Sequence, residues 1–141
     1  MTQADRKHPA FANKNADAFY EIVRQGLGDE VEGSHFWDAV AEEAIFEFMY
    51  HFQGFPNKIK GRKAYMDWFV GYDNVLESAN GLEIYKSGKH IILEYQVHGH
   101  TKSGKSYDNR FCSIITIEKR QIVYWKDYMD SLAVVMASSG V

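Results

Sequence analysis

The sequence contains one cysteine, Cys112, and two prolines in 141 residues. A single thiol cannot form an internal disulfide, which excludes the class of small secreted domains held together by disulfides. No segment approaches the roughly 20 apolar residues that a membrane-spanning helix needs. The first 15 residues are polar and lack the apolar centre of a signal peptide, so we expect a cytoplasmic protein with no membrane partner.

An excess of charge of one sign is also missing. Sixteen lysines and arginines stand against 19 aspartates and glutamates, for a net charge of -3. This balance predicts no nucleic-acid partner, because such partners need a strongly basic surface. What the chain has in quantity is aromatic residues, 15% of the total, with nine tyrosines, nine phenylalanines and three tryptophans. The length suits one domain with a core of its own.

Hydrophobic spacing predicts helices in the first half of the chain. Phe19, Val23 and Leu27 recur every four residues, as on the buried face of a helix that ends near Gly28. The elements expected here are a loose arm at 1–12, followed by a single domain over 13–141 that begins with a helix at 15–27, a short helix at 37–42 capped by Ser34, a strand at 44–49 and a helix at 61–76.

Alternating apolar and polar residues predict strands in the second half. The connections between these strands are short, which favours an antiparallel meander. Helices followed by strands indicate an α+β fold, with the helices on one face of a curved sheet. Asp130 is the expected cap of a final helix. The segments are strands at 82–85, 90–100, 107–117 and 122–129, and a helix at 131–137.

The strands separate polar from apolar residues. In the strand at 90–100, Glu94, Gln96 and His98 share one face, and the opposite face is apolar. Polar groups on a covered face need partners or a ligand, so we expect the polar face to line a cavity. The apolar face would then be covered by a second subunit, which predicts a homodimer. The residues expected at this interface are Leu93, Tyr95, Val97, Ile114 and Tyr124.

Asp127 is the most informative single residue. It lies within the last strand, on the face of Trp125 and Met129, and a carboxylate among apolar groups has a raised pKa that suits proton transfer. Glu94 is expected to point into the same space, where two close carboxylates would share a proton and act as one acid and one base. The alternative is structural, with Asp127 paired to a lysine or arginine. Alternation alone leaves both interpretations open.

Two further patterns favour ordinary structural roles. The segment GHTKSGKS, residues 99–106, matches a phosphate-binding loop, but a strand pattern follows it where that loop requires a helix. It is therefore interpreted as a hairpin turn. His98 and His100 lie on one strand face and could hold a metal, but no third ligand has a suitable spacing. We expect neither a metal nor a cofactor.

The ending IVYWKDYMDSLAVV, residues 122–135, together with the α+β order, resembles the SnoaL-like branch of the nuclear transport factor 2-like superfamily. The resemblance covers about residues 15–137. It implies a cone-shaped fold, in which a curved antiparallel sheet wraps around the N-terminal helices and encloses one pocket.

Two families within this superfamily share motifs with the chain. Limonene-1,2-epoxide hydrolase has a similar GKSY turn and a similar WRDYFD strand, whose catalytic aspartate falls on Asp127. Its other catalytic arginine and aspartate fall on Glu94 and Gln96. Its tyrosine and asparagine that position water fall on Phe46 and Phe48. The resemblance therefore implies that most of the hydrolase machinery is absent.

The phenazine-biosynthesis small proteins are the better match. They have a Y-x-N-x-F strand, found here as Tyr107, Asn109 and Phe111, and a glutamate at the place of Asp127 that is thought to act as acid/base. Their earlier strand carries a Val-Glu pair similar to Leu93-Glu94.

The resemblance implies cofactor-free acid/base chemistry on a small apolar or aromatic molecule, such as isomerisation, cyclisation, dehydration or hydrolysis. The alternatives are a non-catalytic ligand-binding or accessory domain and a purely structural dimer module. Phe19 or Tyr20 would close the pocket from the first helix. The expected site residues are Asp127, Glu94 and His98 for catalysis, and Gln96, Asn109, Phe111, Trp125, Met129, Phe46, Phe48, Tyr20 and Trp68 for ligand binding.

Overall fold

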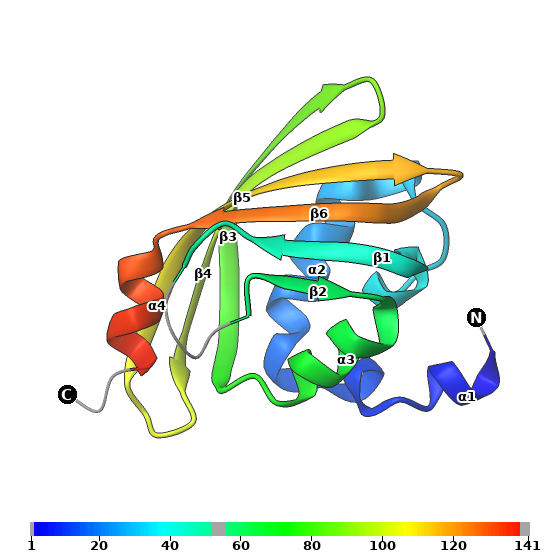
Figure 1. Ribbon diagram of the computed structural model, residues 1–141. Helices are drawn as coiled ribbons and strands as arrows, with labels where there is room; N and C mark the ends of the chain where they lie inside the picture. The colour runs from blue at the N-terminus through cyan, green and yellow to red at the C-terminus, as the bar shows by residue number, and fades with distance from the viewer. Residues whose placement is uncertain (1, 52–55, 139–141) are drawn as a thin grey trace.

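A computed structural model describes residues 2–51 and 56–138 of the chain (Figure 1). Helices come first and most strands follow, so the expected α+β class is confirmed. Within the described part of the chain, no helix is both long and apolar enough to cross a bilayer. The helices are α1 (Gln3–Arg6), α2 (Asp17–Leu27), α3 (Arg62–Val70) and α4 (Ser131–Ser138), with 3₁₀ turns at Pro9–Ala12, Lys14–Ala16, Gly28–Glu30 and Phe36–Ala39.

In the described residues, six strands form one sheet in the order β2-β1-β6-β5-β4-β3. The last four strands along the chain pair consecutively and antiparallel, which confirms the meander predicted from the short connections. The first strand, β1, pairs parallel with β6, and β2 pairs antiparallel with β1 at the edge of the sheet. The strands are β1 (Val40–Phe48), β2 (Lys58–Lys60), β3 (Asn74–Ser87), β4 (His90–Thr101), β5 (Ser106–Glu118) and β6 (Gln121–Met129).

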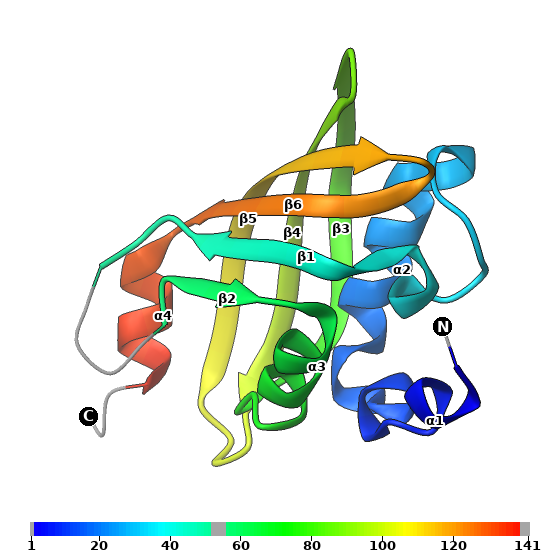
Figure 2. The ribbon, with the colours of Figure 1, turned by 45° about the vertical axis from the view of Figure 1, so that its right-hand side comes forward.

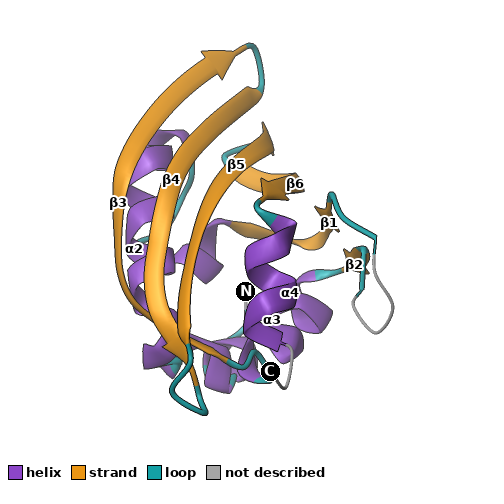
Figure 3. Ribbon diagram, turned by 90° about the vertical axis from the view of Figure 1, so that its left-hand side faces the viewer, coloured by secondary structure: helices purple, strands orange, loops and turns teal. Residues whose placement is uncertain are grey.

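The sheet is strongly curved, as the resemblance implied, and it stays open, with β2 and β3 as its edge strands (Figures 2 and 3). Helices α2 and α3 lie in its hollow, where α2 packs mainly on β3 and β4, and α3 packs on β1 (Figures 2 and 3). The apolar face predicted for α2 is confirmed, because Phe19, Val23 and Leu27 are all at most 5% exposed. Burying a side chain of this size contributes about 1.5–3 kcal/mol, so α2 is held by packing.

Helix α4 lies across one end of the hollow and packs against β5 (Figure 3). The predicted cap is confirmed, since the Asp130 carboxylate accepts hydrogen bonds from the amides of Leu132 and Ala133 at 3.1 and 3.3 Å. Both bonds satisfy amides in the first turn, which have no partner inside the helix. The cap thereby fixes where the chain leaves β6 and turns over the hollow.

The helix expected over residues 61–76 is wrong in its second half. Helix α3 ends at Val70, and the Gly71 amide bonds to the carbonyl oxygens of Asp67 and Trp68 at 3.3 and 3.1 Å. Strand β3 begins at Asn74, well before the expected strand at 82–85. Glycine is a poor helix former, and long pairing with β4 outweighs the helical spacing of the following residues.

The short helix expected at 37–42 is a 3₁₀ turn that ends at Ala39, after which β1 begins at Val40. His35 caps the turn in place of Ser34, because its ring Nδ1 accepts a hydrogen bond from the Trp37 amide at 3.1 Å. The imidazole nitrogen is therefore the N-cap acceptor, a role that a serine oxygen usually has.

The N-terminal segment expected to be a loose arm packs against the domain. Ala10 is fully buried, and its carbonyl oxygen accepts hydrogen bonds from the Tyr20 hydroxyl and the Trp37 indole, both at 3.2 Å. The His8 ring also lies 2.6 Å from a carboxylate oxygen of Asp67 on α3. Buried Tyr and Trp side chains need polar partners, and the Ala10 carbonyl oxygen serves as the acceptor for both.

Candidate functional site

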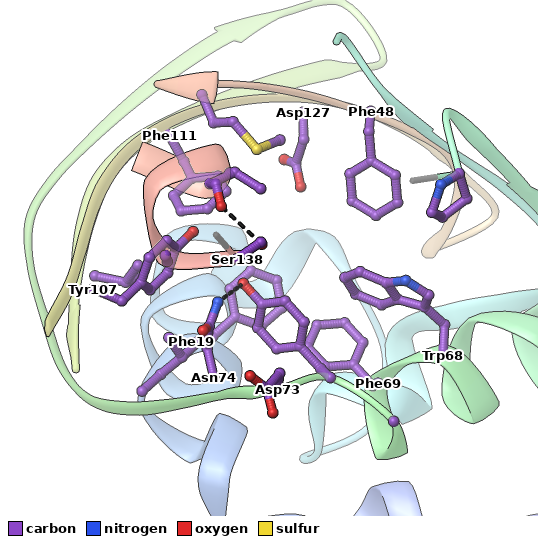
Figure 4. Close-up of a pocket in the computed structure, with 18 of the residues that line it drawn as sticks. Phe19, Phe48, Trp68, Phe69, Asp73, Asn74, Tyr107, Phe111, Asp127 and Ser138 are labelled. Atoms are coloured by element: carbon purple, nitrogen blue, oxygen red, sulfur yellow. Dashed lines mark hydrogen bonds between the residues drawn. The ribbon is translucent and has the colours of Figure 1, made fainter. Parts of the chain in front are cut away.

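A cavity of about 420 Å³ lies between the concave face of the sheet and helices α2, α3 and α4 (Figure 4). This volume lies within the range of pockets that bind small molecules. Nine of the described lining residues are aromatic, which makes much of the interior apolar. They are Phe19, Phe48, Tyr50, Tyr65, Trp68, Phe69, Tyr72, Tyr107 and Phe111.

Asp127 reaches the wall of this cavity from β6. Trp125, Asp127 and Met129 alternate along the strand and point inward, which leaves Asp127 only 3% exposed. In Figure 4 its carboxylate points into the cavity, with Phe48 on one side and Phe111 on the other. The structure therefore places a buried carboxylate inside an aromatic chamber.

The two oxygens of Asp127 have different surroundings. Oδ1 accepts hydrogen bonds from the Ser113 hydroxyl and the Trp125 indole, both at 2.5 Å. The Ser113 oxygen is 2.8 Å from the Tyr95 hydroxyl, which must donate because the serine hydrogen is already used. Oδ2 has no hydrogen bond to any residue in 2–51 or 56–138 and faces the cavity. One oxygen is thus anchored, and the other is available to a ligand.

Burial raises the pKa of Asp127 from an ordinary 3.8 to about 6. The hydrogen bonds from Ser113 and Trp125 act in the opposite direction, because they stabilise the ionised form. No ion pair joins Asp127 to a lysine, arginine or histidine within the described residues. The structural alternative, in which a basic side chain pairs with Asp127, is therefore wrong.

A second polar group lies in the wall formed by β3 and β5. The Asn109 amide donates to the Tyr107 hydroxyl at 2.9 Å, and its oxygen accepts from the backbone amides of Arg110 and Asp130. On the other side, the Asn74 amide donates to the Tyr72 hydroxyl at 2.9 Å. The hydroxyls of Tyr72 and Tyr107 are neighbours, and each shifts the pKa of the other.

The hydroxyl hydrogens of Tyr72 and Tyr107 determine which hydrogen bonds this network can donate to a ligand. Each of the Tyr72 and Tyr107 hydroxyls has one hydrogen to donate. Both asparagines donate to these hydroxyls through their amide groups, so the hydroxyl hydrogens are not used in these bonds. At least one hydroxyl hydrogen is therefore available to a ligand, because both tyrosines line the cavity.

The residues predicted for ligand binding fall into two groups. Phe48, Trp68, Phe111 and Met129 line the cavity. The others lie behind the wall. Trp125 donates a hydrogen bond to Asp127, Asn109 donates one to Tyr107, and Phe46 stacks on Tyr65 with ring centroids 3.6 Å apart. Tyr20 donates to the Ala10 carbonyl oxygen, while its neighbour Phe19 reaches the cavity.

The expectation that Glu94, Gln96 and His98 face the cavity is wrong. All three lie on the outer face of β4, and the inward positions belong to Leu93, Tyr95 and Val97. The Glu94 carboxylate accepts a hydrogen bond from the exposed Tyr85 hydroxyl at 2.9 Å. The structure therefore separates Glu94 from Asp127, and the two carboxylates share no proton.

The His98 ring bonds to Asp108 at 2.7 Å and to Asn80 at 3.0 Å on the outer surface. His100 bonds to Glu77 at 2.5 Å. In the chain as described, no group of three histidines, cysteines or acids is placed to hold a metal. The GHTKSGKS segment forms the β4–β5 hairpin, as interpreted from the sequence.

Sequence analysis missed Ser113, Tyr72 and Tyr95. Ser113 could have been found, because it lies two and four residues from Phe111 and Asn109 and so shares their face of β5. Tyr72 lay inside a segment expected to be helical. Tyr95 was placed on the wrong face together with the rest of β4.

Residues 10–125 match the family model of the SnoaL-like domain. The protein YesE of Bacillus subtilis, whose function is uncharacterized, is 33% identical over 109 residues, which cover 74% of this chain and 72% of YesE. A crystal structure of a Bacillus subtilis protein proposed to be an isomerase is 27% identical, with a TM-score of 0.70, and the match covers 94% of this chain and 96% of that one.

The fold extends to more distant proteins. A protein of Jannaschia proposed to be a SnoaL-like polyketide cyclase has a TM-score of 0.61 at 15% identity, with 91% of this chain and 93% of that chain covered. Such low identity shows a shared fold alone. The match over most of the chain, together with the curved sheet and its cavity, shows that this protein belongs to the SnoaL-like family.

Proposed function

We propose that this protein is a cofactor-free enzyme in which Asp127 moves a proton on an apolar or aromatic ligand bound in the cavity. The observation that carries the proposal is the state of Asp127, which is buried, unpaired with any described cation and open to the cavity through Oδ2. A carboxylate with a pKa of about 6 is mostly ionised at neutral pH, so it can accept a proton. Because this pKa lies close to neutral pH, the group can also return the proton.

The geometry gives each part of the site a role. Oδ2 of Asp127 takes a proton from the ligand, while Ser113 and Trp125 hold Oδ1 and fix the direction of attack. Negative charge that develops on a ligand oxygen is met by a hydroxyl hydrogen of Tyr72 or Tyr107. The aromatic wall excludes water, which keeps the carboxylate basic.

Asp127 is the one buried carboxylate among the described lining residues, since Asp67 and Asp73 are exposed, and a single buried carboxylate favours isomerisation or cyclisation over the other reaction types. In these reactions one group can take a proton and return it elsewhere on the same molecule, whereas acid and base roles in hydrolysis are commonly divided between two groups. Glu94 cannot supply the second role from the outer face. The names of the neighbours point the same way, since one is proposed to be an isomerase and another a polyketide cyclase.

The proposal is tested with 5-nitrobenzisoxazole, a flat apolar molecule that opens when a base removes its one acidic carbon-bound proton. We expect turnover that rises with pH to a plateau, with a midpoint near pH 6, because the ionised form of Asp127 is the base. Asp127→Asn should reduce the rate by about 10²–10⁴-fold. Glu94→Gln removes the same charge from the outer face and should leave the rate unchanged.

Equal rates in the wild type and in Asp127→Asn would contradict the proposed role. If the probe binds in the cavity of both proteins and neither turns it over, the alternative of a non-catalytic ligand-binding domain is favoured. Among the described residues, no second acid hydrogen-bonds to Asp127, and this observation supports the alternative.

We also propose that the protein forms a homodimer through the outer face of the sheet. Three of the residues first assigned to this interface, Leu93, Tyr95 and Val97, are buried inside the subunit instead. Ile114 lies on the outer face between Ile92 and Lys126 of the neighbouring strands. Other apolar or aromatic side chains at least partly exposed on this face are Tyr85, Ile92, Tyr124 and Tyr128.

A further inference from the structure

We infer that the natural ligand of the cavity is a cation, namely an organic ammonium ion joined to an apolar or aromatic group. The inference concerns the ligand class of the same cavity, and it rests on the proposed function in taking this cavity as the site. Three independent features of the wall support it: an unpaired buried carboxylate, a lining without basic side chains, and a high density of aromatic faces.

Asp127 supplies the first feature. Its carboxylate is 97% buried but accepts hydrogen bonds only from the neutral groups of Ser113 and Trp125, and both reach the same oxygen. Buried charges in proteins are normally paired, because removing an ion from water without a counter-ion is costly. Oδ2 faces the cavity, so a ligand cation would be the missing partner.

The charges around the cavity supply the second feature. Among the lining residues that the structure describes, none is a lysine, arginine or histidine, whereas three are aspartates. Asp67 is engaged by His8 and Lys63, but the exposed Asp73 carboxylate forms no ion pair or hydrogen bond with a described residue. Asp73 and Asp127 thus give the cavity a negative potential that attracts cations and repels anions.

Lys105, in the β4–β5 hairpin, is a basic residue whose side chain reaches α4. Its ammonium group bonds to the carbonyl oxygen of Met136, in the last turn of α4. A cation at that position is favoured by the partial negative charge at the C-terminal end of a helix. The charge of Lys105 is therefore used on the helix and does not neutralise Asp127.

Aromatic faces supply the third feature. Phe48 and Trp68 lie with ring centroids 5.0 Å apart, and Trp68 stacks on Tyr65 at 5.7 Å with nearly parallel planes. Figure 4 shows Phe48 beside Asp127 and Trp68 below it. Ring faces attract ammonium groups by about 0.5–2 kcal/mol each, and more strongly where water is excluded. A carboxylate beside such rings is a suitable site for an ammonium group with apolar substituents.

Other ligand charges fit less well. An anionic ligand would meet Asp127 without a compensating cation on the wall. A neutral ligand would leave the carboxylate buried and unpaired, as it is without a ligand. A hydroxyl hydrogen of Tyr72 or Tyr107 suits an oxygen elsewhere on the ligand, so the cation and a polar oxygen can be bound together.

The test compares two phenols of the same shape that differ in charge, (4-hydroxyphenyl)trimethylammonium and 4-tert-butylphenol. Isothermal titration calorimetry at about pH 7 gives the dissociation constant of each. We expect the wild type to bind the cation about tenfold more tightly, in spite of its stronger hydration. Asp127→Asn should abolish or reverse this preference, and Glu94→Gln, which loses the same charge on the outer face, should retain it.

The inference is overturned if the wild type binds the neutral molecule as tightly as the cation, or if neither binds at millimolar concentration. It is equally overturned if Asp127→Asn keeps the full preference for the cation. A thermal unfolding curve of each variant shows that the comparison is made on folded protein. Because 5-nitrobenzisoxazole is neutral, its turnover is independent of this result. Turnover without cation preference refutes the ligand class alone, and cation preference without turnover refutes the enzymatic role alone.

Discussion

Asp127 should make the folded protein less stable at neutral pH than it would be with a neutral side chain at this position. Burial raises the pKa of the carboxyl from 3.8 to about 6, so the folded protein binds the proton more tightly than the unfolded chain does. The stability that this group contributes is therefore fully present below pH 3.8 and is lost as the pH rises through about 6. Asp127→Asn cannot ionise and should not lose stability in this way.

The magnitude follows from the two pKa values. A pKa difference of about 2 corresponds to about 3 kcal/mol of unfolding free energy above pH 7, and only to about 0.5 kcal/mol near pH 4. The amide oxygen of the variant can still accept from Ser113 and Trp125, so the anchoring hydrogen bonds survive the substitution. We expect the stability of Asp127→Asn relative to the wild type to rise by about 2–3 kcal/mol between pH 4 and pH 7.5.

Urea denaturation followed by tryptophan fluorescence at several pH values measures this difference. Asp73→Asn is the matched control, because Asp73 is exposed and its carboxylate forms no hydrogen bond or ion pair in the described chain. Its stability should stay within about 0.5 kcal/mol of the wild type at every pH. Parallel curves for Asp127→Asn and the wild type would refute the argument, because they would show that the Asp127 pKa is the same in the folded and unfolded states.

Two further variants test other parts of the structure. Ser113→Ala removes a hydrogen bond to the ionised carboxylate, so the Asp127 pKa should rise. The midpoint of benzisoxazole turnover should therefore move up by about 0.5–1 pH unit. An unchanged midpoint would show that Ser113 does not hold Asp127 in solution. Ile114→Lys places a charge within the outer face, which should prevent two copies from packing there. Sedimentation velocity at micromolar concentration should show a dimer for the wild type and a monomer for the variant. A monomeric wild type would contradict the dimer.

Sequence reasoning succeeded where the decisive interactions are local. The spacing of Phe19, Val23 and Leu27 predicted α2, because one helix face must be apolar to pack on the sheet. Asp130 was recognised as a cap because only its immediate neighbours are involved. The inward direction of Asp127 followed from alternation with Trp125 within β6.

Sequence reasoning failed where a distant partner decides. The residues after Gly71 have a spacing compatible with a helix, but pairing with β4 from Asn74 onward makes them a strand. The partners of Ala10 are the hydroxyl of Tyr20 and the indole of Trp37, which the sequence could not identify as neighbours. In each case the local preference is weak, and the tertiary contact outweighs it.

The face of β4 that points inward is the opposite of the one predicted, and the cause can be traced to one hairpin. Thr101 and Lys105 close a three-residue loop in which Gly104 has a φ of 95°, and the amide of Thr101 bonds to the Lys105 carbonyl at 2.7 Å. This loop aligns Tyr95 with Phe111, so both rings stand on the cavity side. A loop of two or four residues would shift the register by one and turn Glu94 toward the cavity. Whether Asp127 acts with a second carboxylate or without one therefore depends on the length of a surface turn far along the chain from Asp127.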